Sequence, residues 1–421
     1  MRNVSCTLIP SVVSQHVSDA VVLRSTRAYL VVAPHVKLLD LSRADERLAA
    51  HLDGVAVAGA FGTQMARAEL DSPDRGEVFL ATIRALEERS TDHLQHLIVL
   101  AAASPDALAG LTSAFGWVSA PILRGIVRDL LADADPFCQR FGIAACSLHR
   151  VDLGAALAQA IVSTNASLRA RALRCAGEVG RRDLLSLCVQ SLNDDDAECR
   201  FLAAQASVLL GDRGNGLAML GRIALQPGKF RVQALALALF GMDAAAAGRL
   251  VGHIAGQRED ARLLIRAVGF AGDVSRIPWL IGLMADDKLA RLAGESFSLI
   301  TGTDLAWLEL ERSAPENVEP GLNDNPGDED VAMDEDDGLP WPDQAKIQEW
   351  WVANSQRFQP GVRYFMGAQP TREHCLQVLK DGYQRQRFAA AQYLCLLRPG
   401  TSLFNCAAPA WRQQRLLAEM S

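Results

Sequence analysis

The sequence predicts an all-α protein in which helix hairpins stack into an α-solenoid. Three observations support this prediction. Hydrophobic residues make up 49% of the 421 residues and aromatic residues only 6%, a balance that favours packed helices over a β-sandwich. A phrase that opens with arginine recurs every 29 to 31 residues. Most copies of this phrase end at a glycine that is closely followed by an aspartate.

The repeated phrase is predicted to be one alanine-rich helix. Successive copies open at Arg140, Arg169, Arg200, Arg231, Arg262 and Arg291. Residues 200–211, 231–241 and 262–272 show the pattern most clearly, and each is long enough for about three turns of helix. The terminal glycine can adopt the left-handed backbone conformation that closes a helix.

A second helix is expected after each glycine. An aspartate stands within three residues of it, at Asp183, Asp212, Asp243, Asp273 and Asp304. A short carboxylate at this place can accept hydrogen bonds from the free amides of the next helix. Residues 183–192 and 277–284 then carry leucine, isoleucine and valine at helical spacing. One hairpin of this size cannot bury its apolar face alone, so neighbouring hairpins must stack.

An acidic segment interrupts the array. Residues 309–343 hold 13 Asp or Glu and one Arg, a net charge of −12, which leaves +5 on the remainder of the chain. Residues 315–342 contain few large apolar side chains and are predicted to be a disordered acidic loop. The loop either stays solvated or folds back on a basic face of the array.

The predicted organisation has four parts. An N-terminal helical region (1–132) precedes the repeat array (133–314), the acidic disordered loop (315–342) and C-terminal helical hairpins that cap the solenoid (343–421). In the last part, helices are expected over 344–354, 373–379 and 385–397. A cap is expected because the terminal unit of an array must cover a core that has no further neighbour.

Composition argues against several classes of protein. The nine cysteines show no metal-site spacing, which indicates reduced and mostly buried thiols. The longest uncharged stretch, 107–123, contains glycine and proline and is predicted as buried helix and turn, not as a membrane span. Residues 1–19 lack the continuous apolar core of a secretory signal. A charge of +5 argues against a nucleic-acid-binding surface. We therefore expect a cytoplasmic protein without a cofactor, a metal or a membrane partner.

The repeated phrase, Arg…Ala-Ala…Leu…Gly-Asp, resembles the short HEAT-like repeats first noted in phycobilisome lyases. Other segments resemble a bacterial family of HEAT-repeat proteins of unknown function that are often encoded in type VI secretion gene clusters. These segments are Asp45 to Gly59, Gly76 to Ala81, Trp350 to Gly367 and Arg387 to Ala391. The resemblance implies a setting in type VI secretion. Arg24-Ser25 departs from the family pattern, which has a tryptophan in this early helix.

Two groups of residues are candidates for binding a protein partner. Aromatic side chains are dense over 341–365, and arginines are dense over 169–182. The candidates are Trp341, Trp350, Trp351, Tyr364, Phe365, Arg169, Arg171, Arg174, Arg181 and Arg182. Tryptophan, tyrosine and arginine dominate interface hot spots. Each group also has a structural interpretation, in which the aromatic residues cap the array and the arginines pair with aspartates of neighbouring turns.

No motif in the sequence indicates catalysis. It contains no nucleophile elbow, no dinucleotide fingerprint and no zinc-protease helix. His93 and His96 have a spacing that suits a metal, but no third ligand stands near them, so both are predicted to be structural. We expect a protein that is not an enzyme and that binds another protein, such as a type VI effector or spike component, as an adaptor, chaperone or immunity protein. The alternative is an enzyme of the HEAT-like type, such as a bilin lyase relative or a DNA glycosylase.

The helix hairpins predict a strongly helical circular dichroism spectrum with little strand content. A spectrum that required roughly a quarter or more β-structure would contradict the predicted fold class.

Overall fold

The computed structural model describes residues 8–257, 260–316 and 334–420, so Cys6 and the acidic stretch 317–333 lie outside the described residues. Helices dominate these ranges, which contain isolated β-bridges but no strand. The all-α prediction is confirmed. The chain divides into unit 1 (Met1–Val32, Val36–Val179 and Asn405–Ser421) and unit 2 (Ala33–His35 and Gly180–Phe404). This division falls inside the predicted array and not at its predicted start, residue 133.

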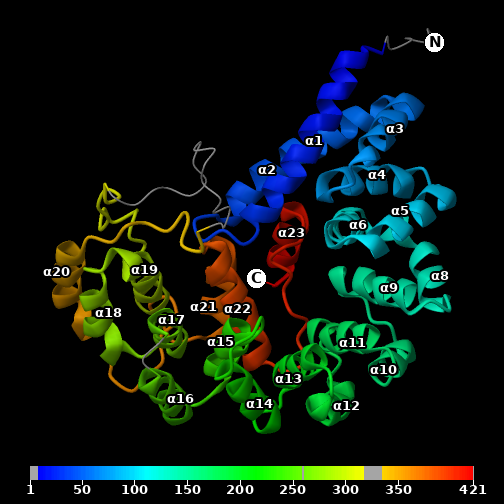
Figure 1. The fold of residues 1–421 in the computed structure, drawn as a ribbon. Coiled ribbons are helices and arrows are strands. Elements are labelled where there is room, and N and C mark those ends of the chain that lie inside the picture. The colour runs from blue at the N-terminus through cyan, green and yellow to red at the C-terminus, as the bar shows by residue number, and fades with distance from the viewer. Residues whose placement is uncertain (1–7, 258–259, 317–333, 421) are drawn as a thin grey trace. The chain divides into compact units, whose positions relative to one another are not determined.

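Unit 1 contains the first eleven α-helices and the last one (Figure 1). Their bounds are α1 Pro10–Leu30, α2 Leu38–Val57, α3 Gly59–Ala68, η1 Glu69–Asp71, α4 Arg75–Glu87, α5 Thr91–Ala103, α6 Pro105–Trp117, α7 Ala120–Leu123, α8 Ile126–Ala132, α9 Pro136–Leu148, α10 Ala155–Ile161, α11 Ala166–Val179 and α23 Ala410–Met420. Helices α4, α6, α9 and α11 each pack against the next, while α5, α8 and α10 pack beside them. The uncharged stretch 107–123 is helix and turn, as predicted.

The C-terminal helix α23 is joined to the start of the chain by a buried ion pair. Arg27 of α1 donates from Nε to Asp45 of α2 at 2.5 Å, and Asp45 also accepts from the backbone amide of Ala410 at 2.7 Å. The same guanidinium donates to the carbonyls of Ala407 and Ala408. Asp45 is fully buried. The buried Asp45 carboxylate is tolerated because it accepts charge-assisted hydrogen bonds from Arg27 and from the Ala410 amide.

Arg24 occupies the position where the resemblance implies a tryptophan. It is buried, its guanidinium lies 5.4 Å from the centre of the Phe79 ring, and its Nε donates to Ser113 at 2.7 Å. Burial, with smaller effects of Arg27 and Arg75, lowers the pKa of Arg24 to about 10. The buried guanidinium is stabilised by its position over the aromatic ring and by its hydrogen bond to Ser113.

Unit 2 contains the clearest copies of the repeat. Its helices are η2 Arg182–Leu184, α12 Leu185–Gln190, η3 Ser191–Asn193, α13 Ala197–Leu210, α14 Asn215–Ala224, α15 Arg231–Gly241, α16 Ala244–Gly256, α17 Ala261–Ala271, η4 Val274–Arg276, α18 Ile277–Leu283, α19 Asp287–Thr301, α20 Gln344–Asn354, η5 Ser355–Arg357, α21 Arg372–Asp381 and α22 Gln384–Leu397. Helices α13, α15, α17 and α19 form a row, and α14, α16 and α18 pack beside them (Figure 1). This packing of neighbouring helices is repeat-like.

The glycine and aspartate signals act as predicted at most repeats. Gly211, Gly272 and Gly302 have positive φ and end α13, α17 and α19. Asp243 accepts from the Ala246 amide at 2.7 Å, and Asp273 from the Ser275 amide at 2.9 Å. There are three exceptions. Asp304 opens a turn and not a second helix, Asp183 accepts from the Arg181 side chain, and Gly241 is the last residue of α15 without a positive φ.

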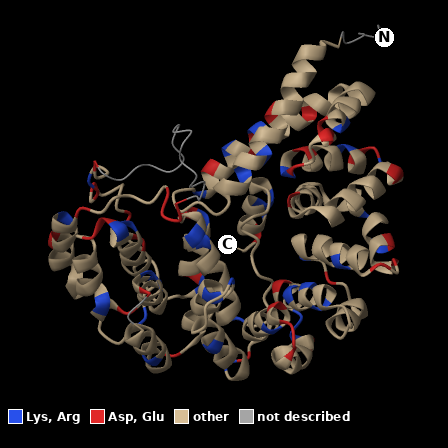
Figure 2. Ribbon diagram, in the orientation of Figure 1, with Lys and Arg blue, Asp and Glu red and all other residues tan. Residues whose placement is uncertain are grey.

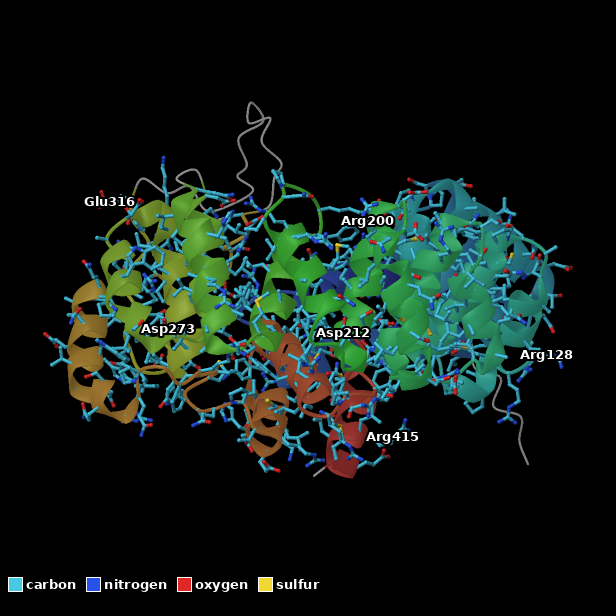
Figure 3. All side chains as sticks on the ribbon, turned by 90° about the horizontal axis from the view of Figure 1, so that it is seen from below. Arg128, Arg200, Asp212, Asp273, Glu316 and Arg415 are labelled. Carbon is cyan, nitrogen blue, oxygen red and sulfur yellow. The ribbon has the colours of Figure 1, made fainter. Side chains whose placement is uncertain are left out.

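The turns that follow the first helices of unit 2 are covered by residues from the end of the chain. The Tyr364 amide donates to Gly272 O at 2.9 Å, and Met366 and Gly367 donate to the carbonyls of Leu299 and Ile300. Figure 3 shows Asp212 and Asp273 toward the side of the helices on which this orange segment runs, and Arg200 toward the other side.

Arg363 belongs to the same covering segment. Its guanidinium donates to the carbonyls of Phe240 and Met242, both at 2.7 Å, and to that of Ala271 at 3.3 Å. These carbonyls lie at the C-terminal ends of α15 and α17, where a cation is favourable. The motif Arg363 to Gly367 thus satisfies backbone groups that the helices leave free.

The prediction that residues 343–421 cap the end of the array is wrong for its last two helical segments. Helix α22 packs on α13 and α15 within unit 2, and α23 belongs to unit 1. Only α20 follows the row, against α18. The return of α21 and α22 over earlier repeats is a long-range contact that helical periodicity does not encode.

All eight cysteines of the described ranges are buried thiols outside disulfide bonds, so the prediction for these thiols is confirmed. Burial raises the pKa of Cys175 and Cys188 to about 12. Thiols with a raised pKa carry little thiolate and are poorly reactive.

We expect Gly272→Ala to lower the free energy of unfolding by at least about 2 kcal/mol, because φ is positive and an added Cβ would overlap the Tyr364 carbonyl oxygen. Gly252→Ala in α16 is the matched control. Its Cβ would meet nothing within 4 Å, so it should raise stability by about 0.5 to 1 kcal/mol. Urea denaturation measures the free energy of unfolding of both variants. Equal effects of the two substitutions would contradict this account of the glycine turns.

Candidate protein-binding surface

The arginines that open the repeats lie at the N-terminal ends of the first helices, and their partners differ. Arg200 donates from Nη1 to the carbonyls six and five residues before it, at 2.6 and 2.9 Å. Arg169 makes the same two contacts at 2.9 and 3.0 Å. Arg231 instead pairs with Asp260 of the next repeat at 2.5 Å. The predicted pairing with a neighbouring turn therefore occurs at Arg231, while Arg169 and Arg200 brace their own preceding loops.

Four arginines of unit 2 bind the described end of the acidic segment. We name Arg262, Arg266, Arg291 and Arg385 the arginine surface, and Asp334, Glu335 and Asp336 the acidic clasp. Arg262 and Arg266 lie on α17, Arg291 on α19 and Arg385 on α22. Figure 2 colours the basic residues blue and the acidic residues red; α17 and α22 contain no Asp or Glu.

The contact between the two is a set of charge-assisted hydrogen bonds. Arg262 grips Asp336 with both terminal nitrogens, at 2.8 and 2.6 Å, and Arg266 donates to Glu335 at 2.6 Å. Arg291 pairs with Asp334. Main-chain oxygens take part as well, since Arg385 donates to Glu335 O at 2.8 Å and Arg291 to Asp336 O at 3.2 Å. Bidentate pairs of this kind are strong and geometrically specific.

Burial is graded along the acidic clasp. The Asp336 side chain is 4% exposed, whereas that of Glu335 is 66% exposed. The hydrogen bonds that Arg262 donates to Asp336 raise the pKa of Arg262, and the hydrogen bond that Arg266 donates to Glu335 lowers the pKa of Glu335. Asp336 is thus the anchor, and the exposed Glu335 pair contributes little to stability.

For its described part, the prediction of a disordered loop is wrong. Residues 334–342 are packed, because the carboxylates meet arginines and Trp341 lies against two guanidinium groups. The Trp341 ring is 4.6 Å from Arg291 and 5.5 Å from Arg312. Composition predicts disorder where there is little to bury, but it cannot foresee a cluster of cations that neutralises the segment.

The remaining aromatic candidates pack inside unit 2. Tyr364 and Phe365 are 9% and 1% exposed. The Trp350 ring meets Phe297 at 5.7 Å, and the Trp351 ring meets Phe358 at 5.5 Å. In this structure these rings pack on other aromatic side chains of α19, α20 and the covering segment.

The arginine candidates of 169–182 are not part of the arginine surface. Arg171 and Arg174 converge on Glu178, at 3.4 and 2.8 Å. Arg181 pairs with Asp183, and Arg182 is exposed. Residues 334–336 of the acidic segment contact arginines of later repeats.

Glu178 is the centre of a buried charge cluster in unit 1. It also accepts from Ser147 and lies 3.6 Å from Arg150. Burial alone would raise the pKa of Glu178, but Arg174, Arg171 and Arg150 outweigh it and hold the value at about 2. The cluster therefore requires the ionised carboxylate.

His93 and His96 lie on α5 beside a pocket of about 240 Å³ that Thr63, Arg67 and Arg84 also line. Arg67 and Ser90 both contact His93 Nδ1. Arg84 is paired with Glu87 and Glu88 at 2.6 and 2.8 Å. The charges here already have partners, and within the described ranges no group of three or more His, Cys, Asp or Glu side chains is placed to hold a metal ion.

No protein-family model matches this chain, and no curated protein is detectably similar. Among the helices of the described ranges, none combines the length and apolar character needed to span a bilayer.

We expect Glu178→Gln to lower the free energy of unfolding by about 3 to 5 kcal/mol at pH 7, because the partly buried Arg150 and Arg171 and the exposed Arg174 lose their counter-charge. A folded-state pKa below the ordinary 4.5 adds stability that is present above pH 4.5 and lost as the pH falls toward 2. The shift corresponds to roughly 3 kcal/mol, of which about 2 kcal/mol should be lost by pH 3.

Chemical denaturation of the wild type and of Glu178→Gln at pH 7 and pH 3 checks this prediction. The difference in free energy of unfolding between the two proteins should be smaller at pH 3 than at pH 7. Glu349→Gln, at an exposed position of α20, is the control and should change stability by less than about 0.5 kcal/mol at pH 7. A gap that stays constant or widens toward pH 3 would contradict the role of Glu178.

Proposed function

We propose that this protein is an α-solenoid scaffold that binds another protein. The resemblance of its repeats and end motifs places the proposal in type VI secretion, with the protein acting as an effector adaptor or chaperone, or as an immunity protein. The partner is then an effector or a spike component. No catalytic role is part of the proposal.

The arginine surface is the observation that carries this proposal. Three helices from separate parts of unit 2 present arginines that bind consecutive residues of one segment. Two of these arginines reach main-chain oxygens of Glu335 and Asp336. A surface that binds both carboxylates and backbone of a short segment has the chemistry needed to recognise a peptide of another protein.

The test is affinity capture from the native host with the tagged full chain, followed by cross-linking and mass spectrometry. We expect the wild type to retain a specific partner cross-linked to α17, α19 or α22. Retention should fall at least ten-fold for Arg266→Gln/Arg291→Gln, because loss of close charge pairs weakens an interface by more than about 1.4 kcal/mol.

Arg222→Gln/Arg249→Gln is the matched control, since both arginines are exposed on α14 and α16. It removes the same charge from elsewhere in unit 2 and should leave retention unchanged. Equal retention by all three proteins would exclude the arginine surface as the binding site. Capture of no partner by any of them would contradict the proposed function itself.

A further inference from the structure

We infer that the arginine surface recognises an acidic segment of a partner protein, and that the acidic clasp occupies this surface in the partner's place until such a segment displaces it. The inference rests on the proposed function and adds the chemistry of the partner and the regulation of the site. The clasp is then an autoinhibitory mimic built into the chain.

The chemistry of the contact defines the partner. Three consecutive carboxylates, Asp334, Glu335 and Asp336, each meet an arginine, and no apolar side chain of the clasp takes part in these bonds. Arginine pairs carboxylates in a planar, two-pronged geometry that a lysine cannot reproduce. The matching ligand is an extended stretch of at least three acidic residues with a free main chain.

The clasp is not needed to close the chain between α19 and α20. The base of this connection is held by backbone bonds, from Arg312 N to Trp341 O and from Asp343 N to Leu310 O, both 2.8 Å. Arg312 also pairs with Asp287 at 2.6 Å. Since the connection is already closed beneath it, the clasp can leave the surface without opening this connection.

The contact is also suited to exchange. At this edge Arg266 pairs with Glu335, whose side chain is 66% exposed, and Arg385 reaches the main-chain oxygen of Glu335, so water and an incoming carboxylate reach this edge first. A pair with so exposed a carboxylate is weak and is screened by salt. At the buried edge, Arg291 Nε has no hydrogen-bond partner, so the clasp does not satisfy every donor of the surface. A partner segment can replace the clasp pair by pair from the Glu335 side.

Covalent attachment favours the clasp over any free segment. A tethered ligand experiences an effective concentration in the millimolar range when its connection is short and flexible. The fraction of molecules with a vacant surface is therefore small, and the apparent affinity for a partner falls by that fraction. Neutralising the clasp should strengthen binding of an acidic peptide, which is the opposite of what loss of a structural element would do.

The test uses the full chain and a fluorescein-labelled peptide, Asp-Glu-Asp-Asp-Gly-Leu, the sequence of residues 334–339, with its C-terminus amidated. Binding is measured by fluorescence anisotropy at 50 and 500 mM NaCl. We expect Asp334→Asn/Glu335→Gln/Asp336→Asn to bind the peptide at least ten-fold more tightly than wild type at low salt, and the difference to shrink at high salt. Adding Arg266→Gln/Arg291→Gln to this variant should abolish the gain.

Glu309→Gln/Glu311→Gln/Glu316→Gln is the charge-matched control, because it removes three exposed carboxylates of the same connection. This control distinguishes an effect of vacating the arginine surface from an effect of the changed net charge. It should bind the peptide with the same affinity as the wild type. If the triple clasp variant has a lowered melting temperature, Asp334→Asn/Glu335→Gln keeps the buried Asp336 anchor and should still gain at least three-fold.

Three results would overturn the inference: clasp variants that bind no more tightly than wild type, an equal gain in the charge-matched control, or a gain that survives loss of the arginines. The peptide assay needs no native partner. A failure there leaves protein binding through another surface intact, whereas a failed capture experiment contradicts the proposed function without bearing on the peptide result.

Discussion

The close approach of the chain's returning segment to the glycine turns is the constraint on which unit 2 depends. Gly180, Gly211, Gly272 and Gly302 follow α11, α13, α17 and α19, and each has positive φ. A Cβ on Gly302 would lie 2.5 Å from Met366 O, and one on Gly211 3.0 Å from the Pro399 side chain. Two stretches of the returning segment therefore contact these turns. Residues 363–367 lie against the turns at Gly272 and Gly302, and residues 396–400 lie against those at Gly180 and Gly211. An array of hairpins normally has contacts only between nearest neighbours, whereas here one segment couples repeats that are not adjacent in sequence.

The opposite ends of the same helices pose a different problem, because each begins with an arginine. Where the preceding loop offers carbonyl oxygens, as for Arg200, the arginine turns back onto it. Where the next repeat offers a carboxylate, as Asp260 does for Arg231, it bridges the two repeats. Arg262 and Arg291 lie near the end of the row, and the acidic clasp supplies their partners. The arginine that recurs at this position of the repeat thus makes three kinds of contact. Which kind it makes depends on which hydrogen-bond acceptor is within reach.

Unit 1 places charges in its interior in two clusters. Asp45 holds Arg27 and the start of α23, and Glu178 holds Arg171 and Arg174. Both clusters combine a buried carboxylate with guanidinium groups and further hydrogen bonds, the condition under which an interior ion pair is tolerated. In each cluster, loss of the carboxylate would leave a guanidinium group without its counter-charge. The packing of unit 1 is therefore specified by polar contacts as well as by apolar ones.

The sequence by itself determined the helices and their ends. The bounds of α15, α18, α20 and α22 follow the predicted segments closely, since helical periodicity, a glycine with positive φ and an aspartate at a helix start act over a few residues. What only the tertiary structure decided is the partner of each functional group. Asp336 is buried in the most acidic part of the chain because Arg262, 74 residues away, reaches it, and Phe365 is buried because α22 returns over earlier repeats. From composition, Asp336 is predicted to lie in a disordered loop. For Phe365, composition cannot distinguish a residue that caps the array from one that binds a partner. Burial and ion pairing depend on contacts between distant parts of the chain, and a single sequence carries no local signal for them.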